Sequence, residues 1–216
     1  MSVNPDGDAL VARELVKRYG DSLALGPIDL RVGPGEMVAL LGPNGAGKST
    51  LLGLAAGLLE PSSGELLVYG EAPGSMAARR LVSFAPDTPS LYEDLSIAET
   101  AEFVARLHGQ PEPERTVARL LERLGLAERA DQLPSQLSHG LRQRAALVVA
   151  MARPSRLLLL DEPYATLDAR SAGIVAACLA EAVASGSAVV VVSHQHDLLP
   201  GDCRRLHLRE AHLDDE

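Results

Sequence analysis

Short runs of apolar residues recur along the chain, and most end in turn residues followed by a longer helical pattern. The clearest runs cover residues 37–42, 66–70, 81–85, 156–161 and 188–193. A continuous apolar run of this length is typical of a strand that is buried on both faces of a sheet. The alternation of such runs with helical segments predicts an α/β fold, with a mainly parallel sheet and helices packed on it.

The segment from about residue 86 to residue 153 departs from this alternation of strand and helix patterns, because it has helical patterns and no convincing strand. Ser96 and Glu99 have the spacing of a capping box at the start of one helix. On another helix, apolar residues recur at i, i+3, i+4 and i+7, namely Val117, Leu120, Leu121 and Leu124. We therefore expect a helical subdomain at about residues 86–153, inserted into one domain that spans residues 1–216.

Composition narrows the class of protein. A net charge of −9 opposes a general nucleic-acid-binding role, because phosphate backbones are held mainly by clustered Lys and Arg. Cys178 and Cys203 lack metal-ligand spacing, which favours two ordinary thiols in a reducing compartment. The N-terminal stretch has no signal-peptide pattern, and the apolar runs are too short to cross a bilayer. These features predict a cytoplasmic protein.

The stretch "GPNGAGKST" lies between an apolar run and a helical pattern. Its Gly42-x4-Gly47-Lys48-Ser49 spacing is typical of a phosphate-binding loop. Glycines let such a loop wrap until successive backbone N–H groups face one anion, and the helix start adds its positive dipole end. Lys48 would supply a mobile charge for the β- and γ-phosphates, Ser49 a hydroxyl for Mg²⁺, and Thr50 a contact near the α-phosphate. The simpler alternative is a glycine-rich turn that only caps a helix.

Two acidic residues, Asp161 and Glu162, follow the apolar run at 156–161. Ligands of open α/β sheets bind at the carboxyl ends of the strands, where this pair is expected to lie. Asp161 would help to hold Mg²⁺, and Glu162 would orient the attacking water; taken alone, they could equally be a solvated pair. His194 follows another run at the same edge and is a candidate hydrogen-bond donor to a γ-phosphate, although a lone histidine there is more often an ordinary polar strand end.

The stretch "LSHG" precedes a further helical pattern. Ser138 is a good N-cap for that helix. Gly140 would weaken the helix start, so its presence indicates that something comes close to the backbone. The plain alternative is an ordinary capped helix.

Taken in order, these motifs resemble the nucleotide-binding subunits of ABC transporters, and the resemblance covers nearly the whole chain. "GPNGAGKST" matches the Walker A motif, "LSHGLRQR" the signature, "LLLLDEP" the Walker B motif and "ATLD", which ends in Asp168, the D-loop. Tyr19 matches the adenine-stacking residue and His194 the switch histidine. The resemblance implies a P-loop NTPase core with an antiparallel N-terminal β subdomain, ATP hydrolysis as the activity, and ATP and Mg²⁺ as cofactors.

The resemblance also implies roles for individual residues. It assigns catalysis to Glu162, His194 and Lys48. It assigns the metal to Ser49, Asp87 and Asp161. The implied nucleotide-binding set is Tyr19, Gly42, Pro43, Asn44, Gly45, Ala46, Gly47, Lys48, Ser49, Thr50, Asp87, Ser138, Gly140 and Asp161.

Members of this family pair head to tail around two nucleotides, which implies a homodimer or a heterodimer with a second nucleotide-binding subunit. Ser138 and Gly140 would then contact the γ-phosphate of an ATP held by the partner, and Asp168 would cross the same interface. The family also implies a separate transmembrane permease, which would hold the chain at the cytoplasmic face of the membrane. No nucleic-acid partner is expected.

Two departures from the family pattern stand out. In the signature, His139 and Leu141 replace the usual residues, while Ser138 and Gly140 remain. In "SFAPDTPSLYEDLS", Asp87 stands where the family usually has Gln; a carboxylate can reach Mg²⁺ but has no amide N–H to offer to water. This stretch, together with "SHGLRQR", is similar to the branch of the family that serves exporters.

Two alternative functions compete with an exporter motor. One is a non-transport ABC ATPase acting on ribosomes or DNA, although such relatives usually carry two cassettes or a long coiled-coil insertion. The other is an unrelated P-loop kinase or GTPase, which would leave "LSHGLRQR" unexplained.

Overall fold

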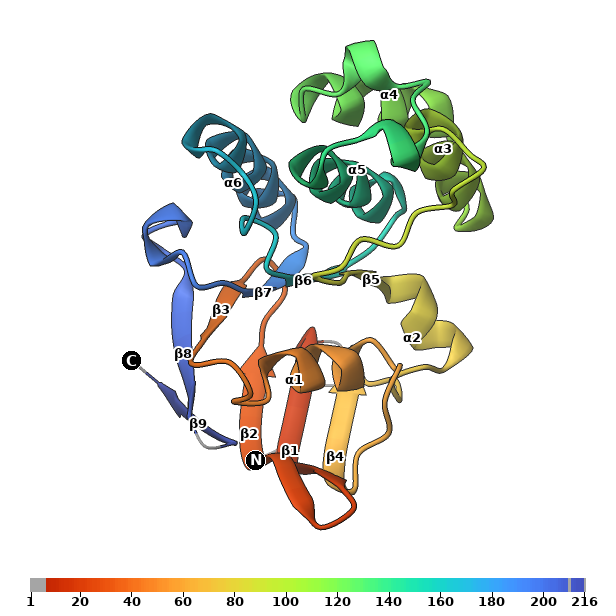
Figure 1. Cartoon of the computed structure of the whole chain (residues 1–216). Helices are drawn as coiled ribbons and strands as arrows, with labels where there is room; N and C mark the ends of the chain where they lie inside the picture. The colour runs from red at the N-terminus through yellow and green to blue at the C-terminus, as the bar shows by residue number, and fades with distance from the viewer. Residues whose placement is uncertain (1–6, 210, 216) are drawn as a thin grey trace.

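Two β-sheets organise the chain in a computed structural model that describes residues 7–209 and 211–215 (Figure 1). The larger sheet has the strand order β5-β6-β7-β3-β8-β9, and the smaller has the order β2-β1-β4. The strands are β1 (Leu10–Tyr19), β2 (Ser22–Val32), β3 (Met37–Leu41), β4 (Ser63–Val68), β5 (Val82–Ala85), β6 (Leu157–Asp161), β7 (Ala188–Val192), β8 (Arg204–Arg209) and β9 (His212–Asp215). The α-helices are α1 (Lys48–Ala55), α2 (Met76–Leu81), α3 (Ile97–Leu107), α4 (Pro113–Arg123), α5 (His139–Ala152) and α6 (Ala169–Ala184). Three short 3₁₀ turns are η1 (Ala127–Arg129), η2 (Pro134–Gln136) and η3 (His196–Leu198).

The larger sheet is parallel from β5 to β8, and only β9 pairs antiparallel, with β8. The smaller sheet is antiparallel throughout. The apolar run at residues 66–70 therefore does not join the parallel sheet; its first part forms the end of β4 in the smaller one. The mixed fold, with a parallel core and an antiparallel N-terminal sheet, agrees with the predicted fold class.

Strand β3 shows why the central strands are apolar at every position. Met37, Ala39 and Leu41 point into the hydrophobic core that contains residues of α3 to α6. Val38 and Leu40 point into the second core, which contains residues of α1 and of the smaller sheet. Because successive side chains of a strand face opposite sides, every position of a strand between two cores faces apolar surroundings.

Helices α3, α4 and α5 occupy the chain between β5 and β6 and lie together at the top of the view in Figure 1. The predicted capping box at the start of α3 is confirmed: the backbone N–H of Glu99 donates to Ser96 Oγ at 3.2 Å, and that of Ser96 donates to Glu99 Oε2 at 2.9 Å. The four apolar residues predicted to share one side of a helix are all buried on α4 and at its end, namely Val117, Leu120, Leu121 and Leu124.

The topology brings four chain segments to one edge of the larger sheet. Parallel strands β3, β5, β6 and β7 all end there. The loop between β3 and α1, the loop after β5 and the turns after β6 and β7 therefore lie next to one another.

Cys178 and Cys203 are free and buried. Within the described ranges, no helix combines the length and the apolar composition needed to cross a membrane.

The capping box yields a first prediction. Replacing Ser96 with Ala removes the oxygen that satisfies a free N–H at the start of α3, so we expect the free energy of unfolding to fall by about 1 kcal/mol. For a chain of this size, that corresponds to a loss of about 2–4 °C in melting temperature. Circular dichroism on heating measures the change, with Ser135→Ala, at an exposed serine, as the control. An unchanged midpoint for Ser96→Ala would show that the cap does not stabilise the helical segment.

Candidate functional site

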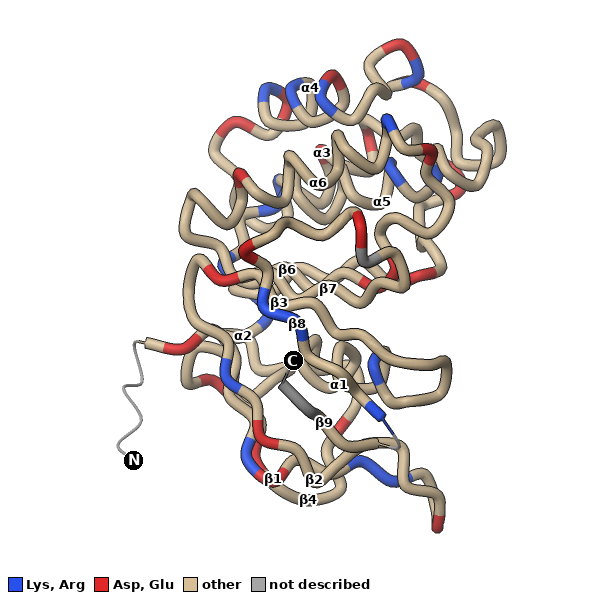
Figure 2. Tube along the Cα trace, turned by 90° about the vertical axis from the view of Figure 1, so that its left-hand side faces the viewer, with Lys and Arg blue, Asp and Glu red and all other residues tan. Residues whose placement is uncertain are grey.

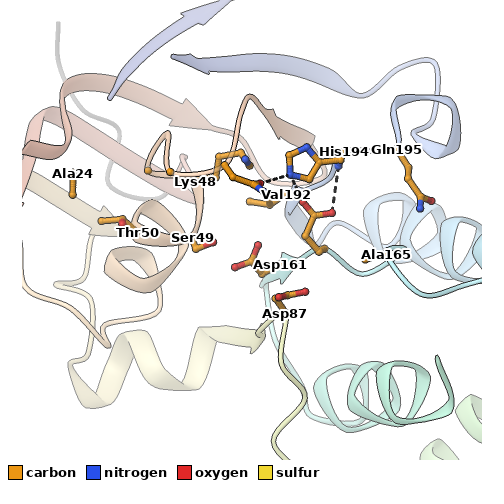
Figure 3. A pocket seen from close by; sticks show the side chains of 14 residues that line it. Ala24, Lys48, Ser49, Thr50, Asp87, Asp161, Ala165, Val192, His194 and Gln195 are labelled. Atoms are coloured by element: carbon orange, nitrogen blue, oxygen red, sulfur yellow. Dashed lines mark hydrogen bonds and ion pairs between the residues drawn. The ribbon is translucent and has the colours of Figure 1, made fainter. Parts of the chain in front are cut away.

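A cavity of about 540 Å³ opens at the carboxyl edge of the larger sheet (Figure 3). Its lining combines the loop before α1, the start of α1, the loop after β5 and the turns after β6 and β7. The lining residues are Ala24, Asn44, Gly45, Gly47, Lys48, Ser49, Thr50, Asp87, Asp161, Glu162, Ala165, Val192, His194 and Gln195. Most of the residues that the sequence predicts for the site therefore meet in one place.

The loop before α1 can be built only with glycine at two of its positions. Gly42 has a φ of 139°, and a Cβ atom there would overlap the backbone carbonyl of Leu208. Gly47 has a φ of 105°, and a Cβ atom there would overlap the carbonyl of Ala24. L-residues with a side chain rarely adopt such angles. The two glycines let the loop pass close to β8 at Leu208 and to β2 at Ala24.

Lys48 begins α1 and is almost fully buried. Its Nζ donates to the carbonyl oxygens of Gly42 at 2.8 Å and Pro43 at 2.9 Å, which holds the ammonium beside the loop. Burial lowers the pKa of Lys48, and the nearby carboxylates of Glu162 and Asp161 oppose that shift. The helix has no side-chain cap at Gly47, so its first N–H groups are available to an anion.

Asp161 ends β6 and is also buried, with only 6% of its surface exposed. Burial raises the pKa of Asp161, as does the charge of Asp87, whereas a hydrogen bond from Ser49 and the charge of Lys48 lower it. Figure 3 shows the Asp87 and Asp161 carboxylates near each other, beside Ser49. Asp87 itself is exposed, in the loop that follows β5.

Glu162 takes a left-handed backbone conformation, with a φ of 50°, that non-glycine residues rarely adopt. Its Oε2 accepts the backbone N–H of His194 at 3.3 Å. The His194 ring atom Nε2 lies 3.0 Å from Asn44 Oδ1 and 3.2 Å from Glu162 Oε1. With the proton on Nε2, the ring N–H points to Asn44, and the buried Oε1 has no hydrogen-bond donor among the described residues. Burial raises the pKa of Glu162, and the His194 ring opposes the shift.

The signature residues lie away from this cavity. Ser138 and Gly140 are absent from its lining, and the exposed Ser138 caps α5 by accepting the N–H of Leu141 at 3.4 Å. A Cβ atom on Gly140 would lie 2.9 Å from the carbonyl oxygen of Thr166. The close approach that the glycine indicates is therefore made, within one chain, by the loop after β6.

Four other predicted residues also lie outside the lining, namely Tyr19, Gly42, Pro43 and Ala46. The Tyr19 ring is half exposed, and Lys17 Nζ lies 5.1 Å from its centroid. Asp168 is exposed and caps α6, where its Oδ1 accepts the N–H of Ser171 at 2.7 Å.

Sequence reasoning missed Gln143, which is buried on α5 and whose Nε2 donates to the carbonyl oxygen of Glu162 at 3.4 Å. A polar residue among the apolar positions of that helix was the available signal. It also missed Ala24, Ala165, Val192 and Gln195 in the lining, although Ala165 opens the "ATLD" stretch and Gln195 follows His194.

The donor set is suited to a phosphate and a hard cation. The described residues contain no group of three or more His, Cys, Asp and Glu side chains arranged to hold a metal ion. The cavity does offer the Ser49 hydroxyl and the Asp161 and Asp87 carboxylates, which are the oxygen ligands that Mg²⁺ prefers. Because Mg²⁺ commonly combines one or two carboxylates with substrate phosphates, these residues fit a metal that arrives with a nucleotide.

Comparisons with known proteins agree with this geometry. The family model described as "ABC transporter" matches residues 25–165. A sulfate/thiosulfate import ATP-binding protein of Methylococcus capsulatus is 44% identical over 165 residues, which cover 73% of this chain and 47% of that protein. A methionine import ATP-binding protein of Xanthomonas oryzae pv. oryzae is 37% identical over 198 residues, covering 88% of this chain and 59% of that protein. The chain thus spans about half the length of the curated relatives it matches.

Solved structures show the same fold. An ATP-binding subunit of an ABC transporter superposes with a TM-score of 0.89 at 29% identity, covering 96% of this chain and 90% of that one. A dimeric ATP-binding cassette in a post-hydrolysis state, bound to ADP and phosphate, superposes with a TM-score of 0.85 at 25% identity, covering 95% of this chain and 98% of that one. With a family model matched over most of its length, the chain belongs to the ABC transporter family.

Proposed function

We propose that the chain is the ATP-binding and ATP-hydrolysing motor subunit of an ABC transporter, which dimerises around Mg-ATP and drives a separate transmembrane permease. The observation that carries the proposal is the convergence of Lys48, Asp161, Glu162 and His194 on one cavity beside a glycine loop. The family supports ATP as the ligand, and two of its similar proteins are named as import ATP-binding proteins.

In this proposal, the glycine loop and Lys48 bind the β- and γ-phosphates. The uncapped N–H groups of α1 face the anion, and a bound phosphate would compete with the Gly42 and Pro43 carbonyls for the Lys48 ammonium. Ser49, Asp161 and Asp87 would hold Mg²⁺, which neutralises charge on the phosphates when bound. The exposed ring of Tyr19 would stack on the adenine.

Glu162 is the proposed general base. Its buried Oε1 has no donor among the described residues, so it is free to accept a hydrogen bond from an attacking water. Burial raises its pKa, which makes the carboxylate a better proton acceptor near neutral pH. His194 contacts both Glu162 and Asn44; in this proposal, its ring would position the base and donate a hydrogen bond to the γ-phosphate.

Dimerisation is proposed from the placement of Ser138. It is exposed at the N-terminus of a 14-residue helix, where the positive end of the helix dipole favours an anion. Because Ser138 and Gly140 do not line the cavity of their own chain, they would be free to meet the triphosphate held by a second copy or a related subunit. Asp168, which is exposed at the start of α6, would lie in the same interface.

The direction of transport is the most specific element of the proposed function. The loop "APDTPSLYEDLS" and the signature "SHGLRQR" support export, whereas the curated relatives named above are import proteins. We propose an exporter permease as the partner, with the chain held by it at the cytoplasmic face of the membrane. The helical segment at about residues 86–153 would be the inserted subdomain of a single ATPase domain.

The first test of the motor is Glu162→Gln. Loss of the base should lower ATP hydrolysis by about 10²- to 10⁴-fold, while nucleotide binding persists, so an ATP-bound dimer should accumulate. Size exclusion with saturating Mg-ATP measures the dimer, and phosphate release measures turnover. Glu122→Gln, at an exposed glutamate of α4, is the control. A Glu162→Gln protein that stays monomeric under these conditions contradicts the sandwich.

The second test compares two serine caps. Ser138→Ala should abolish ATP-dependent dimerisation and lower turnover by about tenfold or more, because a hydrogen bond to a charged phosphate contributes about 1.5–3 kcal/mol. Nucleotide binding by the monomer should stay unchanged. Ser96→Ala is the matched control, since Ser96 also caps a helix through its hydroxyl and should alter stability alone. Equal turnover in both variants would mean that Ser138 is only a cap.

The permease is tested by affinity purification of the tagged chain from detergent-solubilised membranes. We expect a multi-span membrane protein to co-purify with the chain. Transport assays with the reconstituted pair then give the direction. Recovery of ribosomes or DNA in place of a membrane protein would favour a non-transport ATPase.

A further inference from the structure

The Asp87 carboxylate changes the charge of the cavity, and the inference drawn here rests on the proposed nucleotide site. Three carboxylates line the cavity, those of Asp87, Asp161 and Glu162, against the single ammonium of Lys48. That ammonium is already held by two loop carbonyls. The side chains that surround the proposed phosphate position therefore carry net negative charge.

Asp87 contributes to this field at close range. Its charge is one of the causes that raise the pKa of the buried Asp161, and Figure 3 shows both side chains at the cavity beside Ser49. A glutamine at this position, the usual residue in the resembling family, would be neutral. The acid therefore adds a full negative charge where the triphosphate, itself an anion, is proposed to bind.

Stabilisation of the fold does not explain why position 87 carries a carboxylate. In the part of the chain that the structure describes, no hydrogen bond or ion pair of the Asp87 side chain occurs within the usual distances, and the residue is exposed. Asp168 differs in this respect, because its carboxylate caps a helix. The effect of removing the Asp87 charge should thus fall on ligand binding and not on folding.

We propose that Asp87 makes nucleotide binding itself depend on a divalent cation, in addition to hydrolysis, so that the site favours the metal–nucleotide complex over free ATP. Two like charges repel at short range in the partly buried cavity, so metal-free ATP is disfavoured. A divalent cation reverses the sign of the interaction, because the carboxylate that repels the bare triphosphate attracts the metal.

The test measures binding without turnover. The full chain and its variants are titrated with ATP by calorimetry, once in EDTA and once with excess Mg²⁺. Asp87→Asn keeps the shape of the side chain and removes the charge, and Asp87→Glu keeps the charge. Asp94→Asn removes the same charge from an exposed position in the same loop that does not line the cavity.

In EDTA, we expect Asp87→Asn to bind ATP about tenfold more tightly than the unchanged chain, and Asp87→Glu and Asp94→Asn to bind like the unchanged chain. Because Asp87 is exposed, the tenfold gap should narrow as salt screens the charge. With Mg²⁺, the advantage of Asp87→Asn should disappear. Thermal melts should show that all four proteins fold.

Two results separate this inference from the proposed function. If the unchanged chain binds Mg-ATP but Asp87→Asn gains nothing in EDTA, or Asp94→Asn gains as much, the inference is overturned while the nucleotide site stands. If the unchanged chain binds ATP in neither condition, the proposed function is overturned and this inference with it.

Discussion

The burial of opposite charges at one edge of a parallel sheet is the constraint on which the rest of the site depends. Loss of hydration lowers the pKa of Lys48 and raises the pKa values of Asp161 and Glu162. Buried charge is costly unless it is paired and hydrogen-bonded. Loop carbonyls hold the Lys48 ammonium, and Glu162 Oε1 has no hydrogen-bond donor within the described part of the chain. A polyphosphate with its cation and water has the chemistry to pair with these groups.

Much of this arrangement could be predicted from the sequence, because it depends on local patterns. Apolar runs predicted the parallel strands β3, β5, β6 and β7 but not β8, and the Ser96 and Glu99 spacing predicted a capping box that the structure confirms. The glycine spacing gave a loop that no other residue could form, since a Cβ on Gly42 or Gly47 would overlap a carbonyl. The roles assigned to the site residues stay predictions, to be tested as described.

The features that sequence reasoning missed all depend on contacts between distant segments. Residues 66–70 join the antiparallel sheet because Leu66 to Val68 pair with β1, and apolar composition alone does not say which neighbour a strand will find. Gln143 reaches the Glu162 carbonyl from a helix 19 positions earlier in the chain. Tertiary packing, not local pattern, places these groups.

The contact between Gly140 and Thr166 has a mechanical consequence. The start of α5 rests directly on the loop that leaves Glu162, with no room for even one extra methyl group between them, and Gln143 ties the same helix to Glu162 itself. A shift of that loop would therefore be passed to the start of α5, where the exposed Ser138 lies. In the proposed pair of chains, the state of one cavity would thereby reach the surface that is proposed to hold the other nucleotide.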